Sequence, residues 1–415
     1  MERKTFFETF GRPGSPDGIA SFVSRTEQLF REQFTASYHV LDLAERNRQL
    51  LVEGRSGSGK TWHAVEKAVR LAQEDEGQDV LLLCYNLALG KLLEELVEQR
   101  NLERGSITVF QWEQLAARIH DDCGMLYNPP SPDAPMEERL RFYDEEMPGT
   151  LLMCVQEGEY ADKLPKFDAL VVDEAQDHDT TFPDRLGETD PDLCGWWSIY
   201  WSLLHERTAA PMALFFDPSQ RPPFRESSRF DLNLLMSKLS QPAHIRLPQA
   251  LRYTRPIFEF LSDLRGMGTL ELLRELGQPD ELPEGPEVEV YECGEDSSAI
   301  VSQVEGILKD WKERGICGPD EVLLLHLRTT LESSRLTGCD SLAGHRLVDY
   351  LDRDGQEPRE KILLHTSINK AKGLDATGVI VVGLKPFPKI EKPGYQHAYF
   401  MGASRAKQAL AMVHC

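Results

Sequence analysis

The sequence has no Cys-x-x-Cys pair and no long apolar run. Its eight cysteines are scattered along 415 residues, which argues against a disulfide framework or a zinc site and predicts reduced thiols. No stretch is apolar enough or long enough to span a bilayer, and Met1 leads into no continuous apolar segment. We therefore expect a cytoplasmic protein with no membrane partner and no secretion signal.

Positive charge is also scarce. The chain holds 46 Lys/Arg against 68 Asp/Glu, a formal net charge of −22, which is unfavourable for binding nucleic-acid phosphates. The acid is concentrated in residues 121–190, with 19 Asp/Glu against 5 Lys/Arg, whereas the last 55 residues carry eight Lys/Arg. The acidic stretch has two interpretations, a solvated face or a docking surface for a basic partner.

Short β-like runs alternate with helical patterns, which is typical of an α/β protein with a parallel sheet covered on both faces. The length suits two or three domains. We expect an N-terminal extension of unknown role at 1–45, a first α/β domain at 46–240 and a second at 241–415. A small acidic insertion is expected within the first domain at about 120–165. The expected strands are 49–53, 79–84, 107–110, 168–172, 212–216, 243–247, 287–291, 321–325, 361–365, 378–382 and 409–413.

Residues 54–61 read Gly-Arg-Ser-Gly-Ser-Gly-Lys-Thr and form a complete phosphate-binding loop between a predicted strand and a predicted helix. Glycines at Gly54, Gly57 and Gly59 let the backbone, including the Ser58 N–H, curl around an anion at the helix start. Lys60 adds a point charge for the outer phosphates, and Thr61 can place its hydroxyl on Mg²⁺. This motif predicts nucleotide binding.

A carboxylate pair follows the apolar run at 169–172, in the sequence Asp173-Glu174-Ala175-Gln176-Asp177. A carboxylate at the end of a parallel strand lies where open α/β sheets bind ligands. Asp173 is therefore suited to hold Mg²⁺, directly or through water. Glu174 is suited to polarise the attacking water in phosphoryl transfer.

The two motifs together resemble those of the UvrD/Rep branch of superfamily 1 DNA helicases. Further segments in the family's order carry the same resemblance: 80–86 with the helix after it, 217–220, 247–257, 366–376 and 402–407. The resemblance covers the chain from about residue 50 to its end. It implies two RecA-like motor domains with an ATP site in the cleft between them, ATP hydrolysis with Mg²⁺, and single-stranded DNA as partner.

The resemblance also implies roles for individual residues. Gln220 matches the glutamine that senses the γ-phosphate, and Arg252 and Arg405 match the two arginines that reach it when the domains close. Two arginine forks in a water-poor cleft stabilise the charge that builds up during transfer. Gly373 and Asp375 lie in the segment expected at the nucleotide ribose. The implied nucleic-acid contacts are Asn86, Phe224, Arg225 and Thr366.

The chain departs from the family at two places. Leu251 stands where an aromatic residue usually stacks on adenine, and residues 35–39 lack the glutamine that reads the adenine edge. The sequence between Arg252 and Thr366 is short enough that we expect the second accessory domain to be missing. Of two base-stacking aromatics expected after Gln220, the chain keeps only Phe224, which could equally be a packing residue.

These features leave three functions open. The first is an ATP-dependent helicase or translocase on single-stranded DNA. The second is a helicase-like ATPase that does not unwind and serves as a regulatory or sensor subunit for a partner such as a nuclease, for example in genome defence. The third is a nucleotide-gated scaffold without catalytic activity.

Overall fold

The computed structural model describes residues 41–42, 47–74, 77–131, 134–156, 158–182, 193–218, 220, 229–247, 253–267, 282–328, 330–353 and 359–415. Contacts divide the chain into two compact units. We call the unit that contains residues 39–54 and 60–247 the N-terminal unit, and the unit that contains 55–59 and 248–415 the C-terminal unit. No helix in the described ranges is long and apolar enough to cross a membrane.

The N-terminal unit is built on a six-stranded, all-parallel sheet in the order β3-β2-β4-β5-β1-β6. The strands have five or six residues each, and the central strands β1, β4 and β5 are buried along their whole length, as expected for a sheet covered on both faces. Their bounds are β1 Gln49–Glu53, β2 Asp79–Cys84, β3 Ser106–Gln111, β4 Ala169–Asp173, β5 Met212–Phe216 and β6 Pro242–Arg246.

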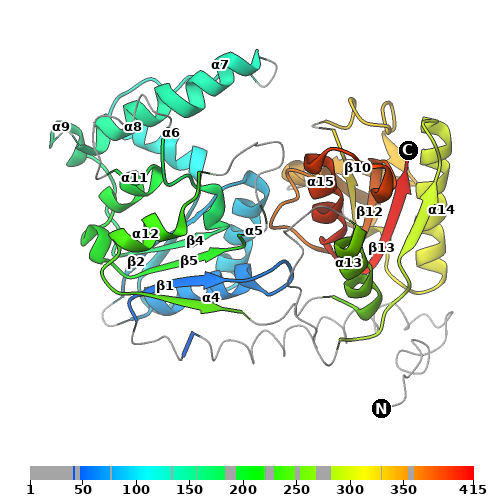
Figure 1. Ribbon diagram of the computed structural model, residues 1–415, viewed down its shortest axis with the longest axis horizontal. Helices are drawn as coiled ribbons and strands as arrows, with labels where there is room; N and C mark the ends of the chain where they lie inside the picture. Colours follow the sequence, from blue (N-terminus) through cyan, green and yellow to red (C-terminus); the bar gives the residue numbers. More distant parts are fainter. Residues whose placement is uncertain are drawn as a thin grey trace. The chain divides into compact units, whose positions relative to one another are not determined.

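Alternate residues of these strands enter two separate cores. Leu50, Val52 and Phe215 face one core with α4 and α5, whereas Leu51, Val172 and Leu214 face the other with α6, α8 and α11. The sheet is therefore the middle layer of three (Figure 1). The helices of this unit are α4 Lys60–Ala72, α5 Leu87–Glu98, α6 Trp112–Asp122, α7 Met136–Arg141, α8 Met147–Gln156, α9 Gly158–Ala161, α11 Trp196–Ser202 and α12 Leu232–Lys238, with short turns η1 Phe142–Glu146, η2 Ala175–Asp177 and η3 Arg207–Ala209.

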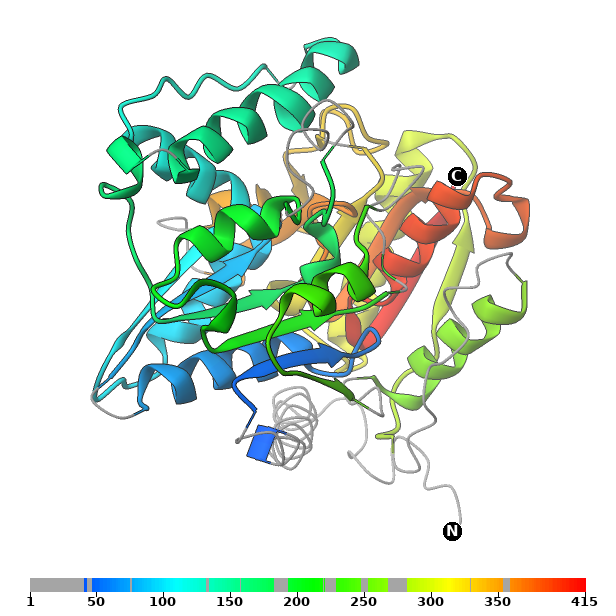
Figure 2. The ribbon, with the colours of Figure 1, turned by 60° about the vertical axis from the view of Figure 1, so that its left-hand side comes forward.

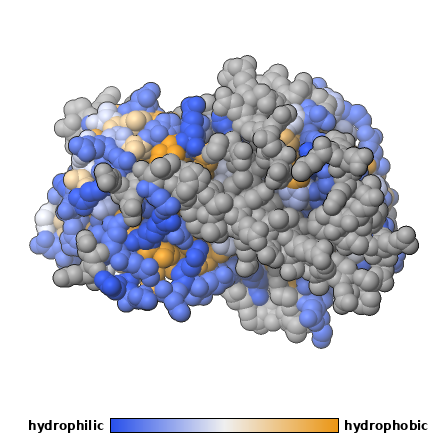
Figure 3. Space-filling model, turned by 90° about the horizontal axis from the view of Figure 1, so that it is seen from below, coloured by the Kyte–Doolittle hydropathy of each residue, from blue (hydrophilic) through white to orange (hydrophobic). Residues whose placement is uncertain are grey.

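The predicted acidic insertion is helical and contains α7, η1, α8 and α9. Only part of it packs on the rest of the unit: α8 lies against α6 and α11, whereas α7 has no buried residue (Figure 2). Three of the large apolar side chains that are exposed in the described residues, Leu126, Met136 and Leu140, lie in this segment. Elsewhere hydrophilic residues dominate the described surface seen in Figure 3, with small hydrophobic patches between them.

The C-terminal unit contains a seven-stranded mixed sheet in the order β7-β13-β12-β8-β11-β10-β9, parallel except for the β9–β10 pair. Helix α14 packs on one face through Ile307 and Trp311, and α13 and α15 contact β12 or β13 outside that core. The bounds are α13 Arg255–Met267, β7 Glu289–Glu292, α14 Ser297–Glu313, η5 Pro319–Glu321, β8 Val322–His326, β9 Ser341–Leu342, β10 His345–Asp349, η6 Tyr350–Asp352, η7 Arg359–Lys361, β11 Ile362–Ser367, β12 Ala376–Leu384, η8 Phe387–Lys389, α15 Pro393–Ala403 and β13 Ala406–His414.

The predicted α/β class is confirmed, and each of the eleven expected strands is present within three residues of its predicted bounds. The sequence did not predict β9 and β10, which are short and carry polar residues such as His345 and Arg346. All eight cysteines are free thiols.

The close approach of α14 to β12 gives a test of the packing in the core of the C-terminal unit. A Cβ on Gly378 would lie 2.8 Å from Cys317 Sγ and 2.9 Å from the Trp311 ring, so Gly378→Ala should overpack this contact. We expect a loss of about 1–3 kcal/mol in unfolding free energy, measured by urea denaturation followed by circular dichroism.

Gly306→Ala is the matched control, because a Cβ there meets nothing within 4 Å in the middle of α14. It should be neutral or stabilise by up to about 1 kcal/mol. Equal effects of the two substitutions would contradict the packing described for Gly378.

Candidate functional site

The loop at residues 54–61 connects the buried end of β1 to the first turn of α4. Its entry is fixed by the Gly54 N–H, which donates to Phe216 O of the neighbouring strand at 3.0 Å. Gly57 and Gly59 have φ values of 80° and 82°, a region that favours glycine, so the loop can curl into the helix start. Strand, loop and helix thus follow one another as the sequence predicts for an anion-binding turn.

Lys60 is buried in the first turn of α4, with 6% of its surface exposed. Its ammonium donates to Gly54 O at 2.9 Å, which bends the side chain back over the loop, and its Nζ lies 4.0 Å from Asp217 Oδ2. A buried ammonium at a helix N-terminus is suited to bind an anion.

The middle of the loop, residues 55–59, is grouped with the C-terminal unit. Ser56 Oγ is 2.8 Å from Tyr253 Oη, and the Arg405 Nη2 donates to the same Ser56 oxygen at 3.3 Å. Ser58 is 1% exposed, and its Oγ has no hydrogen-bond partner in the described ranges. Such an orphaned buried hydroxyl fits a loop whose ligand is a phosphate.

Tyr253 explains why residue 57 is glycine beyond its backbone angle. A Cβ on Gly57 would lie 2.6 Å from the Tyr253 ring, and Tyr253 itself is fully buried and donates to Ser404 O at 3.3 Å. Tyr253 lies inside the predicted motif at 247–257, but no role was predicted for it. Because the contact joins residues almost 200 positions apart, no local pattern could have signalled it.

The Asp173 carboxylate lies at the carboxyl end of β4. In the sheet β5 lies between β1 and β4. The last residues of these three strands, Glu53, Phe216 and Asp173, therefore lie at nearly the same level. Asp173 is fully buried; Oδ1 accepts from the Glu174 N–H at 3.0 Å, and Oδ2 has no hydrogen-bond partner by distance and angle in the described part of the chain. Desolvation and the neighbouring Glu174 charge raise the pKa of Asp173, opposed by the hydroxyl of Thr61 and the ammonium of Lys60.

Asp173 and Thr61 fit a magnesium ion. A buried carboxylate oxygen without a partner beside a threonine hydroxyl is the donor set that Mg²⁺ takes in nucleotide sites, where phosphates and water complete the shell. No group of three or more His, Cys, Asp or Glu within the described ranges could hold a metal by itself. The donor set thus suits a metal that arrives with a phosphate ligand.

Glu174 adopts a left-handed conformation with φ 58° and ψ 43°, which is strained for a non-glycine residue. It is buried, and its Oε2 accepts a short hydrogen bond from Gln176 Nε2. Gln176 Oε1 in turn accepts from the Asp217 N–H at 3.0 Å. The amide of Gln176 therefore joins the residue after β4 to the residue after β5.

Gln220 completes this chain of contacts. Its Nε2 donates to Asp217 Oδ2 at 3.1 Å, the same oxygen that lies 4.0 Å from Lys60 Nζ. The structure thus brings Lys60, Asp173, Glu174 and Gln220 into one buried network in the N-terminal unit. Its connecting residues, Gln176 and Asp217, lie inside two of the predicted motifs, but no sequence pattern assigns them a role.

Arg405 is 2% exposed at the turn between α15 and β13. Its guanidinium donates to Met401 O, Leu374 O and Ser404 Oγ at 2.9–3.1 Å as well as to Ser56. The side chain is therefore held in place by the C-terminal unit itself, next to the middle of the 54–61 loop.

The other predicted site residues have varied surroundings. Gly373 has a φ of 82°, and Asp375 Oδ1 lies 3.9 Å from Lys407 Nζ. Asn86 caps α5 by accepting from the Leu89 N–H at 2.7 Å. Thr366 is fully buried in β11, with an Oγ1 that has no partner in the described ranges. Arg252, Phe224 and Arg225, together with Leu251 and residues 35–39, lie outside the described residues.

The bridge through Gln176 can be tested by replacing it with leucine. Gln176→Leu removes the amide that hydrogen-bonds to the buried Glu174 carboxylate and to the Asp217 N–H. We therefore expect a loss of about 1–3 kcal/mol in unfolding free energy. A melting temperature about 3–10 °C lower by thermal denaturation corresponds to that loss. The exposed Gln99, at the end of α5, is the control. Gln99→Leu should change the melting temperature by about 1 °C or less, and a similar change in both variants would count against the network.

No protein-family model matches this sequence, and no curated protein matches it.

Proposed function

We propose that this protein is an ATP-hydrolysing UvrD/Rep-like superfamily 1 helicase or translocase that acts on single-stranded DNA. The observation that carries the proposal is the buried network in the N-terminal unit. It places the Lys60 ammonium, the Asp173 and Glu174 carboxylates and the Gln220 amide at the carboxyl ends of three adjacent parallel strands. That edge is where open parallel sheets bind ligands.

In this proposal each residue of the network has a separate role in phosphoryl transfer. The 54–61 loop and Lys60 would hold the β- and γ-phosphates of ATP, and Asp173 and Thr61 would hold Mg²⁺, whose charge would offset that of the phosphate oxygens. Glu174 orients a water molecule and accepts its proton, with Gln176 fixing the carboxylate. Gln220 contacts the γ-phosphate, and its hydrogen bond to Asp217 couples the presence of that phosphate to the end of β5.

The strand order supports a RecA-like assignment for the N-terminal unit. In the sheet, β5 separates β1, which leads into the phosphate loop, from β4, which leads into Asp173. The strand that carries Gln220 therefore lies between the two strands that carry the phosphate and metal ligands. We propose that the C-terminal unit is a second RecA-like domain that contributes Arg252 and Arg405 to the γ-phosphate.

A stacked aromatic pair supports single-stranded nucleic acid as the partner. Tyr85 and Trp112, directly after β2 and β3, stack with ring centroids 5.5 Å apart and an interplanar angle of 16°. Both side chains are partly exposed, and Asn86 follows Tyr85 directly. Bases stacked on such rings contribute about 1–3 kcal/mol each.

A second candidate has its own support. The described residues from 253 onward form one sheet with three helices, with no additional domain among them, and the chain carries a net charge of −22. Both features favour a helicase-like ATPase that does not unwind and acts as a regulatory or sensor subunit for a partner such as a nuclease.

Two substitutions at the network test hydrolysis. Lys60→Ala should abolish ATP binding and hydrolysis, because it removes the charge that faces the phosphates. Glu174→Gln should keep nucleotide affinity within a few fold but reduce kcat by about 10²- to 10³-fold, the contribution typical of a general base. Phosphate release and nucleotide titration measure the two quantities, with the exposed Lys309→Ala as a control that leaves both unchanged. Hydrolysis that survives in Glu174→Gln would refute its assigned role.

The same assay separates the two candidate functions. We expect single-stranded DNA to raise the hydrolysis rate at least severalfold in the wild-type protein and to leave Lys60→Ala inactive. Hydrolysis that does not respond to single-stranded DNA or RNA would reject the motor and leave the partner-driven ATPase.

Arg405 gives a further test. Arg405→Ala should lower kcat by about 10³-fold, as for other arginine fingers, while nucleotide affinity falls much less. Because Arg405 also binds Leu374 O and Met401 O, the melting temperature of the variant is measured alongside. Equal losses in turnover and in affinity would contradict the finger role.

A further inference from the structure

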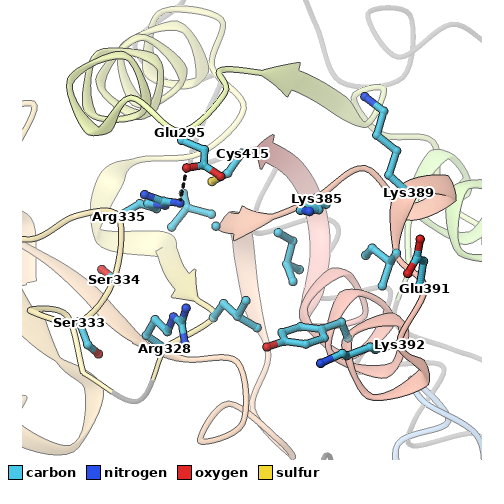
Figure 4. Close-up of a pocket in the computed structure, with 16 residues that line it drawn as sticks. Glu295, Arg328, Ser333, Ser334, Arg335, Lys385, Lys389, Glu391, Lys392 and Cys415 are labelled. Atoms are coloured by element: carbon cyan, nitrogen blue, oxygen red, sulfur yellow. Dashed lines mark ion pairs between the residues drawn. The ribbon is translucent and has the colours of Figure 1, made fainter.

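The C-terminal unit contains a cavity of about 610 Å³ that the proposed ATPase function does not use. Its walls come from segments that follow β8, β12 and β13, together with the turn before α15 (Figure 4). We call it the basic pocket, after Arg328, Lys385 and Lys392, whose side chains surround it from three different segments. The volume is within the range of sites for single small organic ligands.

The pocket lies where the connections that follow two neighbouring strands run in opposite directions. Strands β8 and β12 are parallel neighbours, but the chain leaves them in opposite directions. After β8 it continues to β9, β10 and β11 on one side, and after β12 it continues through α15 to β13 on the other. Connections that diverge from the carboxyl ends of adjacent parallel strands leave a crevice, and open α/β sheets bind ligands in such crevices.

The charge of the pocket is positive, in a chain whose net charge is −22. Five cationic and two acidic side chains line it. Glu295 pairs with Arg335 at 3.4 Å, and Lys389 is 3.9 Å from Glu292. Arg328, Lys385 and Lys392 have no ion-pair or hydrogen-bond partner for their side chains in the described part of the chain. The second acidic group of the lining, Glu391, offsets one of these charges, so the cavity keeps an excess of positive charge that favours an anion with more than one negative charge.

The lining between these cations is mixed, with the partly exposed side chains of Leu327 and Tyr395 beside the hydroxyls of Ser333 and Ser334. Val382 and Leu384 are buried at the end of β12, Ile390 lies in the turn before α15, and the Tyr395 ring comes from the first turn of that helix. Gly383, with a φ of 90°, stands at an irregularity in the pairing of β12 with β13. An inorganic ion would leave the apolar part of this lining, chiefly Tyr395 and Leu327, without a contact, so the pocket fits an organic body attached to the anionic group.

We propose that the basic pocket binds a small organic phosphate monoester, with the phosphate between Arg328, Lys385 and Lys392 and the organic part against Tyr395 and the end of β12. Arginine provides a fork for two phosphate oxygens, and the two lysines add point charges. A phosphate monoester carries close to two negative charges at neutral pH. This site is separate from the 54–61 loop and does not depend on the proposed ATPase function.

Calorimetric titration of the full chain with phenyl phosphate and with inorganic phosphate tests the proposal. We expect saturable binding of one phenyl phosphate, at least about tenfold tighter than inorganic phosphate because the ring buries apolar surface. Arg328→Gln and Lys385→Gln should each weaken it about tenfold or more. Lys361→Gln is the matched control, an exposed lysine of the same unit that does not line the pocket, and it should bind like the wild type. All variants replace exposed side chains, so their melting temperatures should be unchanged.

Three results would overturn the proposal. The first is no saturable binding of phenyl phosphate, or binding that Arg328→Gln and Lys385→Gln leave intact. The second is binding that disappears in Lys60→Ala, which would assign it to the 54–61 loop. The third is competition by an unphosphorylated single-stranded oligonucleotide that is lost in the same pocket variants, which would make the pocket part of a nucleic-acid path.

Discussion

The buried pair of Lys60 and Asp217 is the interaction on which the rest of the candidate site depends. Both side chains are withdrawn from water, and an uncompensated charge at either position would cost about 3–5 kcal/mol. Asp217 sits at the end of β5 and Lys60 at the start of α4, so the pair links the strand that precedes Gln220 to the loop that follows β1. Through Gln176 the same aspartate is joined to Glu174, and three separate chain segments are thereby held in one geometry.

Much of the fold could be predicted from the sequence, because buried parallel strands are short, mainly apolar runs bounded by turn residues. The runs at 49–53 and 212–216 are examples, and both are strands with those bounds. The β9–β10 pair could not be predicted, since its residues show no apolar run and their pairing depends on the rest of the sheet. The same limit applies within the candidate site. Motif spacing selected Lys60, Asp173 and Gln220, but the hydrogen bonds of Gln176 and the packing of Tyr253 against Gly57 arise only when distant segments meet.

The uneven charge of the chain is spatially organised. The acidic insertion is helical, and its α7 has no buried residue, whereas five of the basic side chains in the last 100 residues line one cavity. A single net charge of −22 therefore describes neither region. Counterions and ligands meet two local fields of opposite sign, and at physiological ionic strength each field extends only about 8 Å.

The left-handed backbone at Glu174 has a consequence for the evolution of the fold's stability. A glycine would adopt the same angles without steric penalty, so the glutamate makes the native state about 1–2 kcal/mol less stable than the backbone alone requires. At this position the local conformational preference conflicts with the side chain that the proposed mechanism requires, and the proposal explains why a glutamate rather than a glycine stands here. The surrounding sheet, buried on both faces, provides the excess stability that lets one strained residue persist.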